Sequence, residues 1–291
     1  MAHRDGHPGT PFDDLEHDPA SWLAARIDDT IVAARAHRAM VHALDTAGPD
    51  RVLAAVREVR DAGPSEEGNP ADPALRALIR AWFGAIAETA IDGAIPTGGP
   101  IVLLSNHLSY TDTTATDVAL VAAGHAALAD RIAVLAGPKV WDTPLHALAT
   151  RALNIVPTVQ SEAVGGESAR AAAARLLRGV ALARRRMEEG APLLVYPEGT
   201  RSRSGRLGSF LKGVRHYLGV PGTVVVPVAL QGTDRIYPID ADRLIPGPVR
   251  LAIGAPIPAE DPESALRDAW REIVRMLPER HRPSADTPPV R

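Results

Sequence analysis

The sequence predicts an α/β fold in which helices cover a mixed, mostly parallel sheet and a small helical region precedes it. Short apolar runs of buried-strand type recur between residues 101 and 254, and helical stretches separate several of them. Strands that alternate with helices favour a mainly parallel sheet with helices on both faces. The chain has 291 residues, which is enough for one such domain with a smaller companion.

The N-terminal part is expected to be helical. Residues 1–18 are polar and lack the apolar core of a signal peptide, so they are expected to form a disordered tail. Apolar residues then recur at helical spacing, at Leu23, Ile27 and Ile31 and again at Val52, Val56 and Val59. Asp72 is placed to cap a further helix that has Pro73 in its first turn. The helical region is expected to span residues 19–92.

The α/β domain is expected to span residues 93–278. Its predicted strands are 101–105, 131–137, 154–159, 192–197, 223–230 and 249–254. Its longest predicted helix covers residues 167–190 and ends on Gly190, a good C-cap, and its last helix covers residues 262–277. The polar residues 279–291 are expected to form a second disordered tail.

Composition excludes several kinds of site. The chain has no cysteine, which excludes disulfides, thiolate catalysis and cysteine-ligated metals and fits a reducing compartment. The formal net charge of −3 gives no overall attraction to nucleic acid, so no nucleic-acid partner is expected. No run of about eighteen uncharged apolar residues occurs. A cytoplasmic protein is therefore expected, with at most a peripheral contact on the inner face of the plasma membrane.

A histidine and an aspartate follow the first predicted strand, in the stretch NHLSYTD at residues 106–112. If a helix begins just after His107, Asp112 can accept the Nδ1 proton and leave Nε2 to take a proton from a hydroxyl. The same spacing occurs at His125 and Asp130 and at His281 and Asp286. Only the first pair follows a strand, where α/β proteins place their sites. On local sequence alone, a purely structural role as a helix cap stays open.

A basic loop follows another predicted strand, in the stretch LLVYPEGTRSRSGRLGSF at residues 193–210. Its arginines stand between serines and glycines, which let the backbone come close to an anion while guanidinium groups bind phosphate oxygens. The alternative is a solvated basic loop. That alternative does not explain why a buried strand leads directly into Glu198.

These two stretches resemble the NHxSxxD and FPEGTRSR motifs of the glycerophospholipid acyltransferase family, the group of lysophosphatidate and glycerol-3-phosphate acyltransferases. Their order and separation match as well, and residues 224–233 resemble a third block of that family. The resemblance covers roughly residues 93–255. It implies a glycerol-3-phosphate acyltransferase-like fold and an enzyme of phospholipid biosynthesis.

The resemblance also implies roles for individual residues. His107 would be the general base on the acceptor hydroxyl, and Asp112 would orient it. The hydroxyl of glycerol 3-phosphate or its 1-acyl form would attack the thioester of acyl-CoA or acyl-carrier protein directly, without a metal or another cofactor. The implied substrate-binding residues are Glu198, Gly199, Thr200, Arg201 and Arg203. The acyl chain would lie in an apolar groove beside the sheet, and a membrane surface would be a peripheral partner.

The chain departs from the family pattern between the two motifs. Many members carry an arginine there, whereas the corresponding residues 153–160 contain no basic side chain. Lys139 is the candidate replacement for phosphate binding. The departure keeps two alternatives open: an acyltransferase for an amino-lipid or a specialised metabolite, and a non-catalytic acyl- or lipid-binding protein of the same fold. A serine hydrolase is disfavoured because no G-x-S-x-G motif occurs.

Overall fold

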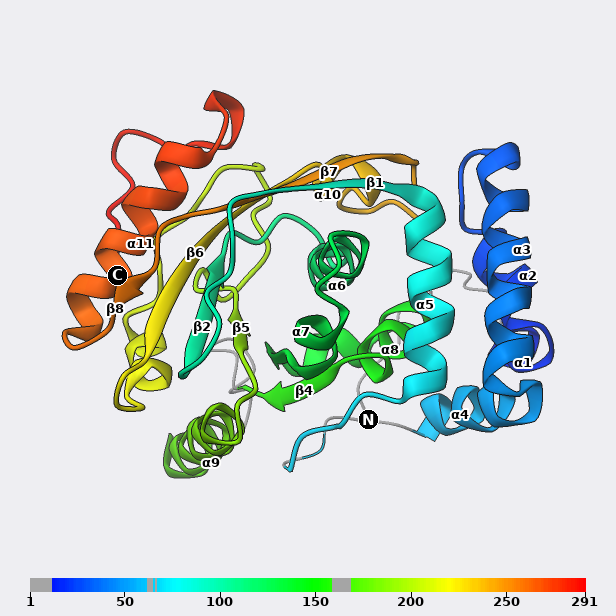
Figure 1. Ribbon diagram of the computed structural model, residues 1–291, viewed down its shortest axis with the longest axis horizontal. Helices are drawn as coiled ribbons and strands as arrows, with labels where there is room; N and C mark the ends of the chain where they lie inside the picture. Colours follow the sequence, from blue (N-terminus) through cyan, green and yellow to red (C-terminus); the bar gives the residue numbers. More distant parts are fainter. Residues whose placement is uncertain (1–11, 62–64, 66, 159–168) are drawn as a thin grey trace.

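A computed structural model describes residues 12–61, 65, 67–158 and 169–291. Within them the strands form one sheet in the order β1-β7-β6-β2-β5-β3-β4, with β8 beside β6 (Figure 1). The strands are β1 (Ala87–Asp92), β2 (Ile101–Ser105), β3 (Ala133–Ala136), β4 (Asn154–Pro157), β5 (Leu193–Val195), β6 (Val224–Gln231), β7 (Gly247–Ile253) and β8 (Ile257–Pro258). The pairings of β6 with β7 and β8 are antiparallel, and the others are parallel. The predicted mixed, mostly parallel sheet is thus confirmed.

Helices cover both faces of the sheet. The α-helices are α1 (Phe12–His17), α2 (Pro19–Ala24), α3 (Thr30–Ala47), α4 (Pro49–Asp61), α5 (Pro73–Ile86), α6 (Asp112–Ala122), α7 (Ala126–Arg131), α8 (Pro144–Arg151), α9 (Ala169–Glu188), α10 (Thr233–Ile236) and α11 (Pro262–Met276). Short 3₁₀ helices are η1 (Pro138–Trp141), η3 (Lys212–Leu218) and η4 (Glu279–His281). The six predicted strands correspond to β2–β7, and the two predicted helices of the domain to α9 and α11. None of the described helices is long and apolar enough to cross a membrane.

The central strand β2 shows why both faces need helices. Its five residues are all buried. Side chains alternate along a strand, so Ile101 and Leu103 pack with α5 and α6 on one face. Val102 and Leu104 pack with α9 and α11 on the other face. Figure 1 shows α11 and α5 on opposite sides of the sheet.

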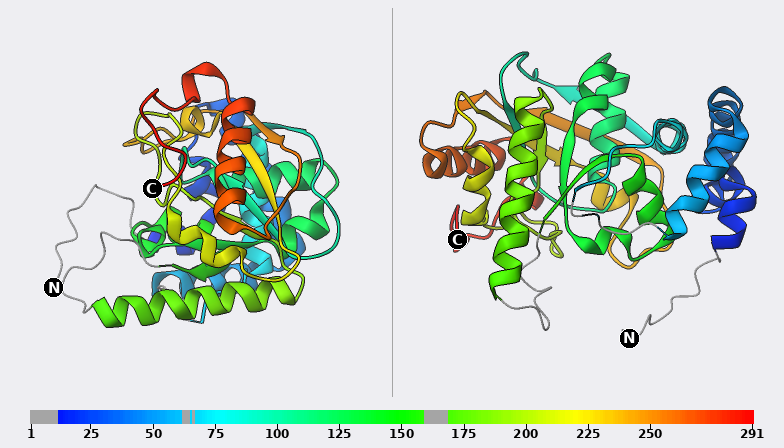
Figure 2. Two further views of the ribbon diagram at one scale, coloured as in Figure 1. Left: turned by 90° about the vertical axis from the view of Figure 1, so that its left-hand side faces the viewer. Right: turned by 90° about the horizontal axis from the view of Figure 1, so that it is seen from below.

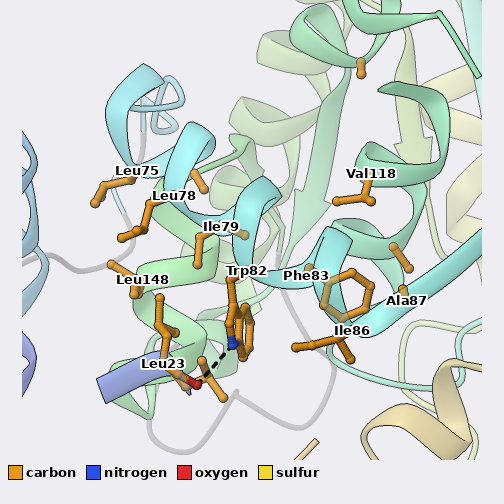
Figure 3. Packing of buried hydrophobic residues seen from close by; sticks show 14 of the residues in the cluster. Leu23, Leu75, Leu78, Ile79, Trp82, Phe83, Ile86, Ala87, Val118 and Leu148 are labelled. Atoms are coloured by element: carbon orange, nitrogen blue, oxygen red, sulfur yellow. Dashed lines mark hydrogen bonds between the residues drawn. The ribbon is translucent and has the colours of Figure 1, made fainter. Parts of the chain in front are cut away.

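Helix α5 joins the N-terminal helices to the sheet. Asp72 caps it by accepting hydrogen bonds from the N–H groups of Ala74 and Leu75, as predicted. Its apolar face is buried, including Leu75, Ile79, Trp82 and Ile86. The Trp82 indole N–H donates to the Leu23 carbonyl at 3.1 Å and links α5 to α2 (Figure 3). Burial of each large apolar side chain contributes about 1.5–3 kcal/mol. The N-terminal helices gather at one end of the molecule (Figure 2).

The first predicted helical face is interrupted. Helix α2 ends at Ala24, Ile27 forms a β-bridge with Leu244, and Ile31 is 80% exposed. The cause is Asp29, whose carboxylate accepts hydrogen bonds from the N–H groups of Ile31 and Val32 and so begins α3. Helical spacing across residues 23–31 was therefore misleading.

The boundary expected at residue 92 is also misplaced. Residues 87–92 form strand β1, which runs parallel to β7 at the edge of the sheet. Strand β1 therefore belongs to the α/β domain and not to the helical region. Its partner comes from the far end of the chain, so no local pattern announced the strand.

The terminal residues are more ordered than expected. Residues 12–17 form α1, with Leu15 fully buried, while residues 1–11 lie outside the described part. At the other end, the Phe210 N–H donates to the Pro289 carbonyl and the Arg291 N–H donates to the Phe210 carbonyl, each at 2.9 Å. The prediction of a disordered tail over residues 279–291 was wrong, because polar composition does not reveal backbone pairing with a distant loop.

Candidate active site

The two sequence motifs meet at one edge of the sheet. Strands β2 and β5 are parallel neighbours, with Leu104 beside Val195. Their carboxyl ends therefore deliver the residues after Ser105 and after Val195 to the same place. The His107 N–H donates to Glu198 Oε1 at 2.8 Å, and the Ser202 N–H donates to the His107 carbonyl at 2.8 Å.

His107 and Asp112 form a hydrogen-bonded pair. The distance from His107 Nδ1 to Asp112 Oδ2 is 2.7 Å. Asp112 is the first residue of α6, is fully buried, and also accepts hydrogen bonds from the N–H groups of Leu108 (2.6 Å) and Ser109 (3.0 Å). These backbone donors fix the carboxylate, so Nδ1 of the imidazole carries the hydrogen that it donates. Nε2 is then the ring nitrogen that can accept a proton.

Two further residues hold His107 in place. The Tyr196 ring stacks on the imidazole with centroids 4.2 Å apart, and its hydroxyl lies 3.0 Å from Thr113 Oγ1 on α6. Asn106 bonds to the Leu230 backbone on β6 twice, donating from Nδ2 (3.0 Å) and accepting at Oδ1 (2.8 Å). Sequence reasoning did not assign either residue, although both stand inside or beside the motifs.

Glu198 fastens two loops together. Oε1 accepts from the His107 N–H, and Oε2 accepts from the Gly208 N–H, both at 2.8 Å. Burial raises the pKa of this carboxyl to about 7, although the two backbone donors act in the opposite direction. Both oxygens are engaged by backbone, so the geometry favours a structural role over the substrate contact that the resemblance implied.

The arginines of the second motif lie on a turn that requires glycine. Gly199 has a φ of +73°, and an added Cβ would overlap the Leu211 side chain. The Arg201 guanidinium lies 3.6 Å from the centre of the Tyr110 ring. Tyr110 in turn contacts the His146 ring, with centroids 4.0 Å apart. This stack holds Arg201 at the cavity wall.

His146 is half-buried, and both of its ring nitrogens are buried without hydrogen-bond partners among the described residues. Burial, together with the nearby charge of Arg201, lowers its pKa to about 4. The imidazole is therefore neutral near pH 7 and acts as an aromatic support for Tyr110.

A cavity of about 1050 Å³ opens at this edge of the sheet. The predicted residues on its wall are His107, Lys139, Glu198, Gly199, Thr200, Arg201 and Arg203. Asp112 lies behind His107, fully buried. Apolar side chains form another part of the wall, including Val134, Leu135, Leu145, Leu153, Ile155 and Leu176. The cavity thus combines a base, cations and an apolar surface.

The arginine expected on the strand between the motifs has no counterpart here. The end of residues 153–160 lies outside the described part, and Arg151 pairs with Glu58 at 3.5 Å, away from the cavity wall. Lys139, on η1, lies on the wall, as do Lys212 and Arg291, which sequence reasoning did not assign to the site.

Comparison with known proteins finds relatives of the segment that contains the two motifs. Residues 89–231 match the Acyltransferase family. A chloroplastic 1-acyl-sn-glycerol-3-phosphate acyltransferase of Arabidopsis thaliana is 36% identical over 92 residues, which cover 31% of this chain and 26% of that protein. A 1-acyl-sn-glycerol-3-phosphate acyltransferase of Cocos nucifera is 31% identical over 109 residues, or 38% of this chain and 35% of that protein.

A solved structure is similar as well. The crystal structure of the 1-acyl-sn-glycerophosphate acyltransferase from Thermotoga maritima gives a TM-score of 0.48 at 21% identity, over 70% of this chain and 81% of that chain. The chain spans about a quarter to a third of the length of the curated relatives it matches. The family match includes both motifs and confirms the resemblance drawn from them. The likeness to the Acyltransferase family is confined to residues 89–231, which contain both motifs.

Proposed function

We propose that this protein is an O-acyltransferase that moves a fatty acyl group from an acyl thioester to the hydroxyl of 1-acylglycerol 3-phosphate. The observation that carries the proposal is the His107–Asp112 hydrogen bond of 2.7 Å at a cavity whose wall also includes Arg201 and Arg203. A base that faces cations can activate a hydroxyl on a molecule that carries a phosphate.

The reaction is a direct transfer. His107 Nε2 takes the proton from the acceptor hydroxyl as its oxygen attacks the thioester carbonyl carbon. The new C–O bond forms, the C–S bond breaks, and the proton passes from the imidazolium to the leaving thiolate. Asp112 stabilises the imidazolium between these two proton transfers. No covalent acyl-enzyme is needed, and the chain has no cysteine that could carry one.

Cationic side chains bind the phosphate of the acceptor, and apolar side chains bind the acyl chain. Arg201, Arg203 and Lys139 bind the acceptor phosphate, and the stack on Tyr110 keeps the Arg201 guanidinium in one plane for that contact. The apolar part of the wall receives the acyl chain. Because the acceptor carries an acyl chain of its own, the protein works as a peripheral protein at a cytoplasmic membrane surface.

The names of the curated relatives favour a monoacyl acceptor over glycerol 3-phosphate itself. The donor is acyl-CoA or acyl-carrier protein. An acceptor other than a glycerophosphate, such as an amino-lipid or a specialised metabolite, is the second candidate, because no basic side chain occupies residues 153–160.

Thiol release tests the proposal. Palmitoyl-CoA and palmitoyl-carrier protein are each incubated with 1-acylglycerol 3-phosphate, glycerol 3-phosphate or no acceptor, and the lipid product is identified by mass. His107→Ala is expected to abolish release. His125→Ala is the matched control, because His125 also precedes an aspartate by five residues but is exposed at the start of α7. Release that persists in His107→Ala contradicts the proposed mechanism, and release that needs no acceptor indicates a thioesterase.

A further inference from the structure

The basic loop of the second motif has little structure of its own. Residues 199–209, here called the arginine loop, lie wholly within the described part and form neither helix nor strand. Within it, the Ser202 hydroxyl donates to the Arg206 carbonyl at 2.6 Å and closes a small turn that contains Arg203. The orientation of the Arg203 side chain therefore depends on the contacts between this turn and residues outside the arginine loop.

The inner side of the arginine loop is held by the active site. The Ser202 N–H donates to the His107 carbonyl, and the Gly208 N–H donates to Glu198 Oε2, both at 2.8 Å. The Gly208 carbonyl also accepts from the Trp270 indole at 3.0 Å. Both sides of the turn are thus attached, and Leu207 beyond it is buried in the core, but none of these contacts fixes the peptide plane between Gly205 and Arg206.

The C-terminal segment holds this part of the loop through the Arg282 carbonyl, which accepts from Arg206 Nη1 at 3.0 Å, and through His281. His281 Nδ1 donates to the Gly205 carbonyl at 2.6 Å, and its own carbonyl accepts from the Leu207 N–H at 2.9 Å. The Arg280 Nε–H donates to His281 Nε2 at 3.1 Å, which places the imidazole hydrogen on Nδ1. The ring is only 2% exposed, so water does not compete for the Gly205 carbonyl.

The conformation of Gly205 depends on this hydrogen bond from His281. Its φ is +72°, a left-handed conformation that alternates easily with others in a glycine. A hydrogen bond to its carbonyl fixes the peptide plane between Gly205 and Arg206 and thereby the turn that carries Arg203. On the other side of the turn, Arg203 lies on the cavity wall.

We propose that His281 is a positioning residue for the phosphate end of the acceptor site. It holds the turn 202–206 so that Arg203 faces the cavity, and it has no contact with the reacting atoms. The inference rests on the proposed function. It places the effect of His281 on the affinity for a phosphate-bearing acceptor and not on the turnover step at His107.

A pair of isosteric variants tests the contact. In His281→Asn the amide nitrogen replaces Nδ1 and can still donate to the Gly205 carbonyl, whereas in His281→Gln the amide reaches the Nε2 position. We expect His281→Gln to raise KM for 1-acylglycerol 3-phosphate about tenfold, with kcat within about twofold. We expect His281→Asn to stay within about threefold of wild type in both parameters. Equal KM values for the two variants would overturn the proposal.

A double-variant cycle separates positioning from general damage. If His281 acts through Arg203, His281→Gln adds no further rise in KM once Arg203→Ala is present. Rises in KM that multiply would overturn the inference. Ile273→Val is the stability control, because Ile273 is fully buried on α11 in the core and is no part of the arginine loop. It is expected to lower the melting temperature without a change in KM.

Failure of the proposed function leaves a separate outcome. If the wild type shows no His107-dependent transfer, binding of glycerol 3-phosphate is measured by calorimetry for the wild type and both His281 variants. A dissociation constant raised by His281→Gln but not by His281→Asn supports the positioning role alone. Unchanged binding in both variants overturns it.

Discussion

Asp112→Asn separates the two contributions that this carboxylate makes to His107. Asp112 Oδ2 accepts from His107 Nδ1, from Leu108 N–H and from Ser109 N–H, whereas among the described residues Oδ1 accepts only from Ser109 N–H, at 3.1 Å. An asparagine therefore has one favourable orientation, with its oxygen at the Oδ2 position. That orientation keeps the hydrogen on His107 Nδ1 and leaves Nε2 able to accept a proton. The substitution thus removes the negative charge while it preserves the tautomer.

The expected fall in kcat follows from the loss of the negative charge alone. Hydrogen bonds to charged groups contribute about 1.5–3 kcal/mol, against about 1 kcal/mol for neutral ones. Because asparagine keeps a neutral hydrogen bond to the imidazolium, the transition state loses only the difference, about 0.5–2 kcal/mol, which corresponds to a fall in kcat of about 2- to 30-fold. An inverted tautomer would cost more, about 10⁴-fold, because Nε2 would then carry a hydrogen and could not act as a base.

The assay is kcat for acyl transfer at saturating donor and acceptor, with the melting temperature measured alongside. Asp117→Asn is the matched control, because Asp117 is buried on the same helix but pairs with Arg80 at 2.7 Å, away from the His107 pair. We expect that control to change stability more than kcat. A fall in kcat below about twofold for Asp112→Asn would refute an electrostatic role, and a fall of about 10⁴-fold would refute the preserved tautomer.

Three further predictions concern buried and stacked groups of the site. Burial raises the pKa of Glu198 from its ordinary 4.5 to about 7, so the folded state binds this proton more tightly than the unfolded state. The free energy of unfolding therefore falls by up to ~3 kcal/mol as pH rises between these values, and Glu198→Gln should remove this pH dependence. His146 acts in the opposite direction, because burial lowers its pKa from 6.5 to about 4 and the unfolded state binds the proton more tightly. The free energy of unfolding should therefore fall as pH drops through this range, and His146→Phe should remove this pH dependence. Chemical denaturation from pH 4 to pH 8 measures both, and a variant that keeps the wild-type profile would contradict its assignment. Arg201→Lys keeps the charge but loses the planar group over Tyr110, so KM for the phosphate acceptor should rise about tenfold with little change in kcat, and an unchanged KM would count against phosphate binding there.

Local patterns in the sequence determined most of the α/β domain. Runs of apolar residues marked β2 to β7, since a buried strand needs apolar side chains on both faces. The Asp72 cap and the face of α5 were also readable, because a capping carboxylate and helical spacing act within a few residues. The His107–Asp112 pair belongs to the same class, because both residues stand at one strand-to-helix junction.

Contacts between distant segments were decided only by the tertiary structure. The sequence could not show that β1 pairs with β7, or that residues 289–291 pair with Phe210, because backbone hydrogen bonds leave no side-chain pattern. It could not show that both carboxylate oxygens of Glu198 accept hydrogen bonds from backbone N–H groups, or that Arg201 stacks on Tyr110 and Tyr110 on His146. Short sequence motifs identify which residues can take part in the reaction. The orientation of these residues depends on neighbours from distant segments, which only the folded sheet brings together.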